Sequence, residues 1–284
     1  MASAKEIRGQ IKATQNTAKI TKAMEMVAAS KMRKAQDRVL DARSYAEGIE
    51  RVVANLMNSH PEYKHPFLVE REVKRTGVIA VSTDKGLCGG LNTNAMKEVL
   101  SVSKAADGEV QFMNIGRRAG QFMRRFGGSL LASAEDVNDS PALQEVLGVV
   151  QVAMERYLAG ELDEVYLVYT QFVNTMSQKP VSIRLLPCAK QEDNTEATYW
   201  DYLYEPDSQV VLDGLLRRYI EALVYHALLE NKACEHSARM VAMKSATDNA
   251  KEIVKDLQVT YNKARQAAIT QEIAEICSGA AASA

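Results

Sequence analysis

The chain has 284 residues, 46% of them hydrophobic, and a formal net charge of −1 at pH 7. This length and apolar content suit one or two folded domains with a real core. The near-zero net charge argues against a general nucleic-acid or membrane binder. No apolar run reaches the roughly 18 residues that a membrane span needs, and the N-terminal "MASAKEIRGQ" lacks the apolar core of a secretion signal.

Residues 1–60 are expected to form one long helix. All six prolines lie between residues 61 and 206, and a proline inside a helix costs about 3 kcal/mol. Steps of four and three along this segment pass mostly through apolar or small residues, which predicts a coiled-coil seam. The seam comprises Ile7, Ile11, Thr14, Ala18, Thr21, Glu25, Ala28, Met32, Ala35, Val39, Ala42, Ala46, Ile49, Val53 and Leu56.

The stretch "KITKAMEMVAASKMRKAQ" (Lys19–Gln36) has no clean polar face. Apolar side chains cover one side, and basic residues crowd its C-terminal end. This basic stretch, Ser30–Arg38, is either a solvated face or a surface for an acidic protein partner. Nucleic-acid binding is disfavoured, because no aromatic residues are interleaved with the charges and no known motif is present.

Residues 75–190 alternate between short β-rich runs and helical runs, which predicts a small Rossmann-like α/β domain with a largely parallel sheet. The expected strands are Thr76–Thr83, Val110–Gly116, Ser129–Ser133, Glu164–Phe172 and Val181–Pro187, and the third has the weakest signal. The expected helices are Asn92–Ala106, Arg117–Phe126 and Pro141–Ala159.

The glycine loop "DKGLCGGLN" (Asp84–Asn92) follows the first strand and precedes a helix, where nucleotide-binding folds hold phosphates. Its spacing matches neither G-x-G-x-x-G nor a P-loop. We therefore interpret it mainly as a structural turn, with a ligand role as the less favoured alternative.

No catalytic residues, metal ligands or cofactor site are predicted. The histidines His60, His65, His226 and His236 have no metal-binding spacing and are expected to face solvent or cap helices. The four widely spaced cysteines, Cys88, Cys188, Cys234 and Cys277, are expected to be reduced thiols rather than a disulfide framework or zinc site.

Residues 207–284 predict a second long helix that pairs antiparallel with residues 1–60. Its expected seam is Ala246, Ala250, Ile253, Leu257, Thr260, Ala264, Ala267, Gln271 and Ala274. A stripe of Ile269, Ile273 and Ile276 lies off this seam and is either core or partner surface. The aromatic cluster "YWDYLYEPD" (Tyr199–Asp207) is equally compatible with a core and an interface.

Several motifs closely resemble the γ subunit family of bacterial F-type ATP synthases, over nearly the whole chain. They are "KEIRGQI", "TKAMEMVAASKMRKAQ", "STDKGLCGGLN", "NTMSQKP", "WDYLYEPD", "LLRRYIEALVYHALLEN", "ARMVAMKSATDNA" and "YNKARQAAITQEIAEICSGA". The terminal motifs are the most specific. The regulatory cysteine insertion of the chloroplast type has no counterpart here.

This resemblance implies a non-catalytic rotary shaft that couples rotation of the membrane-embedded c-ring to conformational changes of the β subunits. The implied partners are the hexameric ring of α and β subunits, the ε subunit and the c-ring, with no cofactor and no nucleic acid. The implied location is peripheral, on the cytoplasmic face of the bacterial plasma membrane. The corresponding divisions are residues 1–60, 75–190 and 207–284.

The resemblance also assigns contact residues. Met24 matches the position that meets the β lever loop, and Lys31, Arg33 and Lys34 are expected to face acidic β loops. Residues expected to contact the α/β ring from the second helix are Arg239, Arg265, Gln266, Thr270 and Glu272. Tyr202, Tyr204 and Glu205 match the foot that faces ε and the c-ring. Cys277 replaces a usually aliphatic residue, with no expected consequence.

Two other function classes are alternatives to the rotary shaft. A nucleotide-dependent α/β enzyme with helical arms is disfavoured by the loop spacing, and it predicts that the isolated chain binds ATP. A coiled-coil adapter or nucleic-acid binder predicts a free-standing protein, and binding to DNA would then depend steeply on salt.

Overall fold

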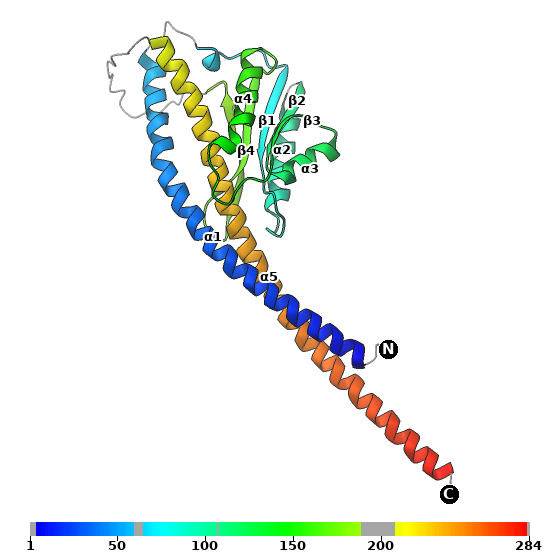
Figure 1. The fold of residues 1–284 in the computed structure, drawn as a ribbon. Helices are drawn as coiled ribbons and strands as arrows, with labels where there is room; N and C mark the ends of the chain where they lie inside the picture. Colours follow the sequence, from blue (N-terminus) through cyan, green and yellow to red (C-terminus); the bar gives the residue numbers. More distant parts are fainter. Residues whose placement is uncertain (1–3, 60–64, 107, 189–207, 283–284) are drawn as a thin grey trace. The chain divides into compact units, whose positions relative to one another are not determined.

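The computed structural model describes residues 4–59, 65–106, 108–188 and 208–282, and the chain divides into two compact units. The first unit comprises residues up to Ala28 and from Met240 onward, and the second comprises Ala29–Arg239. Two long helices, α1 (Ala4–Ser59) and α5 (Ser208–Ala282), contribute to both units (Figure 1). These helices confirm the two long terminal helices that the proline distribution predicts.

In the first unit, α1 and α5 form an antiparallel helix pair (Figure 1). The Thr21 and Thr247 hydroxyls lie 2.7 Å apart across this pair. Every predicted seam position of α1 between Ile7 and Ala28 is buried or half-buried. The predicted α1 seam is therefore confirmed in this unit.

The predicted α5 seam is correct in its period but wrong in part of its phase. At every second predicted position, the residue that faces the seam is the next one along the chain. Val254 rather than Ile253, and Tyr261 rather than Thr260, is half-buried. Ile253 is 50% exposed. The prediction followed a run of small residues, whereas the larger Met243 and Val254 face the seam. The observed seam is Met243, Thr247, Ala250, Val254, Leu257, Tyr261 and Ala264.

The second unit contains a five-stranded sheet with the order β3-β2-β1-β4-β5. All neighbouring pairs are parallel except β4 and β5, which are antiparallel. The strands are β1 (Arg75–Val81), β2 (Glu109–Ile115), β3 (Ser129–Ala134), β4 (Glu164–Phe172) and β5 (Gln178–Leu186). All five predicted strands are confirmed, including the weakest of them, β3.

Helices cover both faces of this sheet because successive residues of each strand point to opposite sides. In β1, Val78 and Ala80 pack beneath α2 (Leu91–Ala105) and α3 (Arg117–Phe126). Ile79 and Val81 belong to the larger core on the other face, with α4 (Gln144–Leu158) and α5. A 3-10 turn, η1 (Pro66–Leu68), also contributes to the larger core.

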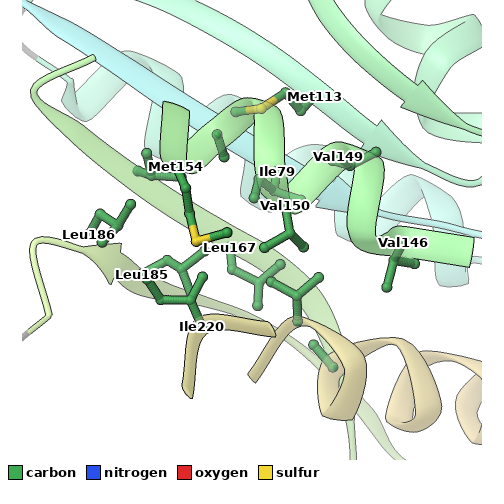
Figure 2. Close-up of a cluster of buried hydrophobic side chains, with 14 of the residues drawn as sticks. Ile79, Met113, Val146, Val149, Val150, Met154, Leu167, Leu185, Leu186 and Ile220 are labelled. Atoms are coloured by element: carbon green, nitrogen blue, oxygen red, sulfur yellow. The ribbon is translucent and has the colours of Figure 1, made fainter. Parts of the chain in front are cut away.

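The larger core joins α5 to the sheet. Figure 2 shows α4 side chains such as Val150 and Met154 beside Leu167 of β4, Leu185 of β5 and Ile220 of α5. Ile220 and Leu185 are at most 1% exposed. Burial of such side chains stabilises the fold by about 1.5–3 kcal/mol each, so this part of α5 is an integral element of the α/β unit.

Candidate functional surfaces

The α1 face around Met24 is apolar but largely uncovered. Ala28 is buried in the seam and Met24 is half-buried, whereas Ile20, Met26 and Val27 are 55–60% exposed. Ile20 and Val27 lie four residues before and three after Met24, so they share its helix face, and exposed apolar side chains on one face are typical of a surface that another protein covers. The structure thus places Met24 at the edge of the seam, next to an apolar face that this chain leaves open.

The C-terminal part of α5 carries four of the predicted contact residues, Arg265, Gln266, Thr270 and Glu272. Every residue from Arg265 to Ser278 is exposed. The Ile269, Ile273 and Ile276 stripe is 47–71% exposed, so within the described residues it is not core. Of the two alternatives, core and surface, the stripe is therefore surface.

Two side chains at the ends of the basic stretch of α1 bind Asp139. Lys31 Nζ lies 2.6 Å from Asp139 Oδ2, and Arg38 Nη1 donates to the Asp139 carbonyl at 3.2 Å. Partial burial opposes ionisation of Asp139, but the hydrogen bond and charge of Lys31 outweigh it and lower the Asp139 pKa. Arg33 and Lys34 are exposed. Lys31 is therefore committed to an internal ion pair, whereas Arg33 and Lys34 point to solvent.

The glycine loop between β1 and α2 is held by contacts within the second unit. Asp84 at its start accepts hydrogen bonds from the Arg117, Asp136 and Val137 amides at 3.0–3.1 Å. At Gly86, an added Cβ would lie 2.9 Å from Arg118 Nη2. The loop therefore connects neighbouring elements, in keeping with its interpretation as a structural turn.

Arg239, another predicted contact residue, reaches this loop. Its Nη2 lies 2.7 Å from Glu235 Oε1 and donates to the Gly86 carbonyl at 3.2 Å. Its side chain is only 13% exposed. Arg239 is therefore engaged inside the second unit. The Arg265–Glu272 segment belongs to the first unit and is exposed.

The prediction that the histidines face solvent or cap helices is partly wrong. His65 does cap η1, because its Nδ1 accepts from the Phe67 amide at 3.1 Å, but its side chain is buried. His236 is 2% exposed, 3.7 Å from Asp139, and burial lowers its pKa. His236 is buried because the chain encloses α5 at this point, which the sequence pattern did not indicate.

The four cysteines lie within the described residues, whereas the aromatic cluster does not. Cys88, Cys188 and Cys234 are buried free thiols, as expected, and burial raises the pKa of each. Cys277 is exposed. Tyr202, Tyr204 and Glu205 lie outside the described residues, as does the rest of the cluster from Tyr199 to Asp207.

Sequence reasoning missed the charged residues of α5 that are buried between Ala227 and Ser237. All eleven residues of this segment are buried, among them Glu230, Lys232 and Glu235. A signal existed: Lys232, Glu235 and Arg239 are spaced i, i+3 and i+7, so they share one helix face.

Among the described helices, none is apolar over a length sufficient to cross a bilayer.

The chain matches the family model described as ATP synthase over residues 3–282. The ATP synthase gamma chain of Cupriavidus metallidurans is 54% identical, and the alignment covers 99% of this chain and 100% of the relative. That of Thiobacillus denitrificans is also 54% identical, with the same coverage.

Solved structures agree with these sequence matches. A chain of the Tetrahymena thermophila mitochondrial ATP synthase central stalk and c-ring is 26% identical, with a TM-score of 0.64 over 80% of this chain and 99% of that chain. A chain of the Euglena gracilis mitochondrial ATP synthase is 20% identical, with a TM-score of 0.70 over 98% and 94% of the two chains. The second likeness supports the fold alone.

Proposed function

Because the chain belongs to the ATP synthase gamma-chain family, we infer that it is the central rotary shaft of a proton-translocating F-type ATP synthase. Rotation of the c-ring turns the shaft, and the shaft drives the β subunits in sequence through states that bind, form and release ATP. The observation that carries this conclusion is the full-length match at 54% identity. The uncovered apolar faces of α1 and α5 support it, because such faces require a surrounding partner.

We place the chemistry on the β subunits and none on this chain. Supporting this, the glycine loop uses its Gly86 carbonyl to accept from Arg239 and packs Gly86 against Arg118. A phosphate-binding loop instead directs its backbone amides toward the ligand. The chain acts by differential contact, since it shifts each β subunit only as far as its contacts favour one conformation over another.

The proposed partners are the α/β ring for the helix pair, and ε and the c-ring for the foot. Met24 and the segment with Arg265, Gln266, Thr270 and Glu272 would meet the ring. Tyr202, Tyr204 and Glu205 would meet ε and the c-ring. The chain would then be peripheral, held at the cytoplasmic face of the bacterial plasma membrane through the complex.

The test is affinity purification of the tagged full chain from detergent-solubilised membranes, followed by sizing and an ATPase assay. We expect a complex of several hundred kilodaltons that contains ATPase subunits. Recovery of a species no larger than the single chain would favour the adapter function instead.

A truncation after Lys263 tests the coupling role more sharply. Of the α5 residues that it removes, Ala264 is half-buried and Arg265–Ser278 are exposed, so the remaining helix pair should keep its thermal midpoint. ATP synthesis by the reconstituted complex should be lost, because the contacts with the ring are gone. A truncated complex that synthesises ATP at the normal rate would contradict the assignment of this segment.

A further inference from the structure

Four charged residues gather where α5 passes the loops after β1 and β3. They are Asp84, Lys232, Glu235 and Arg239, all in the second unit, and we call them the charged clamp. Their side chains are 4–13% exposed. Two acids and two bases balance, so the group is neutral as a whole.

The contacts of the clamp follow one face of α5. Lys232 Nζ donates to the Val137 carbonyl at 2.9 Å and lies 3.9 Å from Asp84 Oδ2 and 3.7 Å from Glu235 Oε2. Glu235 Oε1 in turn pairs with Arg239, whose guanidinium binds the Gly86 carbonyl. One helix face thus grips two loops, the one after β1 and the one after β3.

Neighbouring contacts hold the same turns of α5 from other directions. Ser237 Oγ donates to the Thr175 carbonyl, in the β4–β5 loop, at 2.7 Å. His236 faces Asp139, which Lys31 of α1 also binds. The helix is therefore polar and enclosed here, whereas its earlier part, around Leu216 and Ile220, packs on the sheet through the apolar side chains of the larger core.

These two kinds of contact constrain a helix differently. Apolar burial is non-directional. It therefore fixes the distance between α5 and the sheet more firmly than it fixes the rotation of α5 about its own axis. Two charge-assisted hydrogen bonds run from α5 to the loops, from Lys232 to the Val137 carbonyl and from Arg239 to the Gly86 carbonyl. Such bonds require particular donor and acceptor positions and add geometric specificity. Buried ion pairs contribute little net stability compared with apolar replacements, so the placement of four such groups at one point suggests a geometric role.

Resting on the proposed function, we propose that the charged clamp transmits torque from the α/β unit into the long helices. It lies where α5 passes from the second unit to the first, since the division falls after Arg239. Asp84, Lys232 and Glu235 act as positioning residues: they lock the rotation of α5 relative to the sheet and touch no reacting group. Rotation of the foot then turns the helix instead of being lost as slippage.

The test uses the complete complex reconstituted in liposomes, with Lys232→Met as the main variant. Met keeps the length and apolar stem of Lys but lacks the ammonium group. We expect ATP hydrolysis within about twofold of wild type, together with at least a threefold drop in protons pumped per ATP hydrolysed. Lys232→Arg, which retains the charge, should restore most of the coupling. The matched control is Arg156→Met, which removes a surface ion pair with Glu161 in the same unit.

A second variant guards against misfolding. Glu235→Gln keeps the side-chain shape but removes the charge that Lys232 and Arg239 share. Its ratio of protons pumped to ATP hydrolysed should fall at least twofold, and this variant carries the test if Lys232→Met does not assemble. Assembled clamp variants that couple as well as wild type would overturn the clamp but leave the shaft function intact. A wild-type complex whose proton pumping does not depend on this chain would overturn both.

Discussion

Met24 shows how a single side chain is placed by the helix pair. It is half-buried at the seam edge, and its flexible, uncharged thioether suits a surface that packs against changing shapes. We expect Met24→Lys to leave assembly intact and to reduce ATP synthesis several-fold. If Met24 meets an acidic β loop as proposed, the added cation would form an extra ion pair that hinders rotation. The measurement is ATP synthesis against ATP hydrolysis in the reconstituted complex. Met24→Leu is the control, and normal coupling in Met24→Lys would contradict the placement.

Glu230 is a buried carboxyl whose titration should be visible in stability. It is 8% exposed, and burial raises its pKa to about 7. Since the folded-state pKa exceeds that of the unfolded chain, the native state binds the proton more tightly. The stability from this proton is complete below the unfolded pKa of about 4.3 and is lost as pH rises through about 7.

Glu230→Gln should therefore stabilise the chain at pH 8 by about 1–2 kcal/mol, a figure reduced from 1.36 kcal/mol per pKa unit for partial hydration of the site. The gain should be smaller at pH 5.5, where the native carboxyl is protonated. Urea unfolding at both pH values measures it. The exposed Glu252→Gln should change neither value, and equal effects of Glu230→Gln at both pH values would rule out the titration.

At the scale of the elements, the energy that couples the two helices can be measured at a hydroxyl contact between them. Thr21 and Thr247 are 2.7 Å apart, and Thr247 is 2% exposed. Replacing one Thr by Val removes the contact between the helices, while the remaining hydroxyl can still donate to the Ala18 or Met243 carbonyl of its own helix; the change should cost about 1 kcal/mol. Replacing both should cost less than the sum, by about 0.5–1 kcal/mol. Urea unfolding of the four proteins gives this coupling energy, and strict additivity would show that the contact contributes nothing.

The predictability of the elements follows from how locally each is encoded. The helices α2, α3 and α4 and all five strands begin and end within about three residues of expectation, because prolines, glycines and hydrophobic periodicity act within short windows. The α1 seam was also predictable from its period. The phase of the α5 seam was not, because Ala and Thr are common on both sides of Val254 and Tyr261, and only the partner helix decides between them.

The charged clamp was beyond sequence reasoning for a different reason. Lys232 and Glu235 have the spacing of an ordinary solvated ion pair on a helix. Only the fold brings the loops after β1 and β3 over this face and makes the same residues buried. Sites built from loops distant in sequence are invisible to a local pattern, whereas the contact residues proposed in the Arg265–Glu272 segment rest on family resemblance.

For the whole molecule, the exposed stripe of α5 predicts a difference between folding and assembly. The triple variant Ile269→Gln, Ile273→Gln and Ile276→Gln alters side chains that are 47–71% exposed. Each change should alter the unfolding free energy by less than about 0.5 kcal/mol, while the yield of assembled, coupled complex falls several-fold. Urea unfolding and affinity purification measure the two effects. Val210→Gln, at a 61% exposed position near the start of α5, is the control. Full assembly of the triple variant would show that the stripe has no partner.

The pairing of the two ends of the chain has a consequence for biosynthesis. Thr21 and Thr247 are 226 residues apart, with the whole α/β unit between them. At about 5–20 residues per second, a ribosome needs about 10–45 s to make the intervening chain. The first helix therefore waits, with its seam uncovered, until the last helix is made. During this interval the nascent chain exposes an apolar seam, and the excess of lysine and arginine over acidic residues in residues 1–60 favours its solubility.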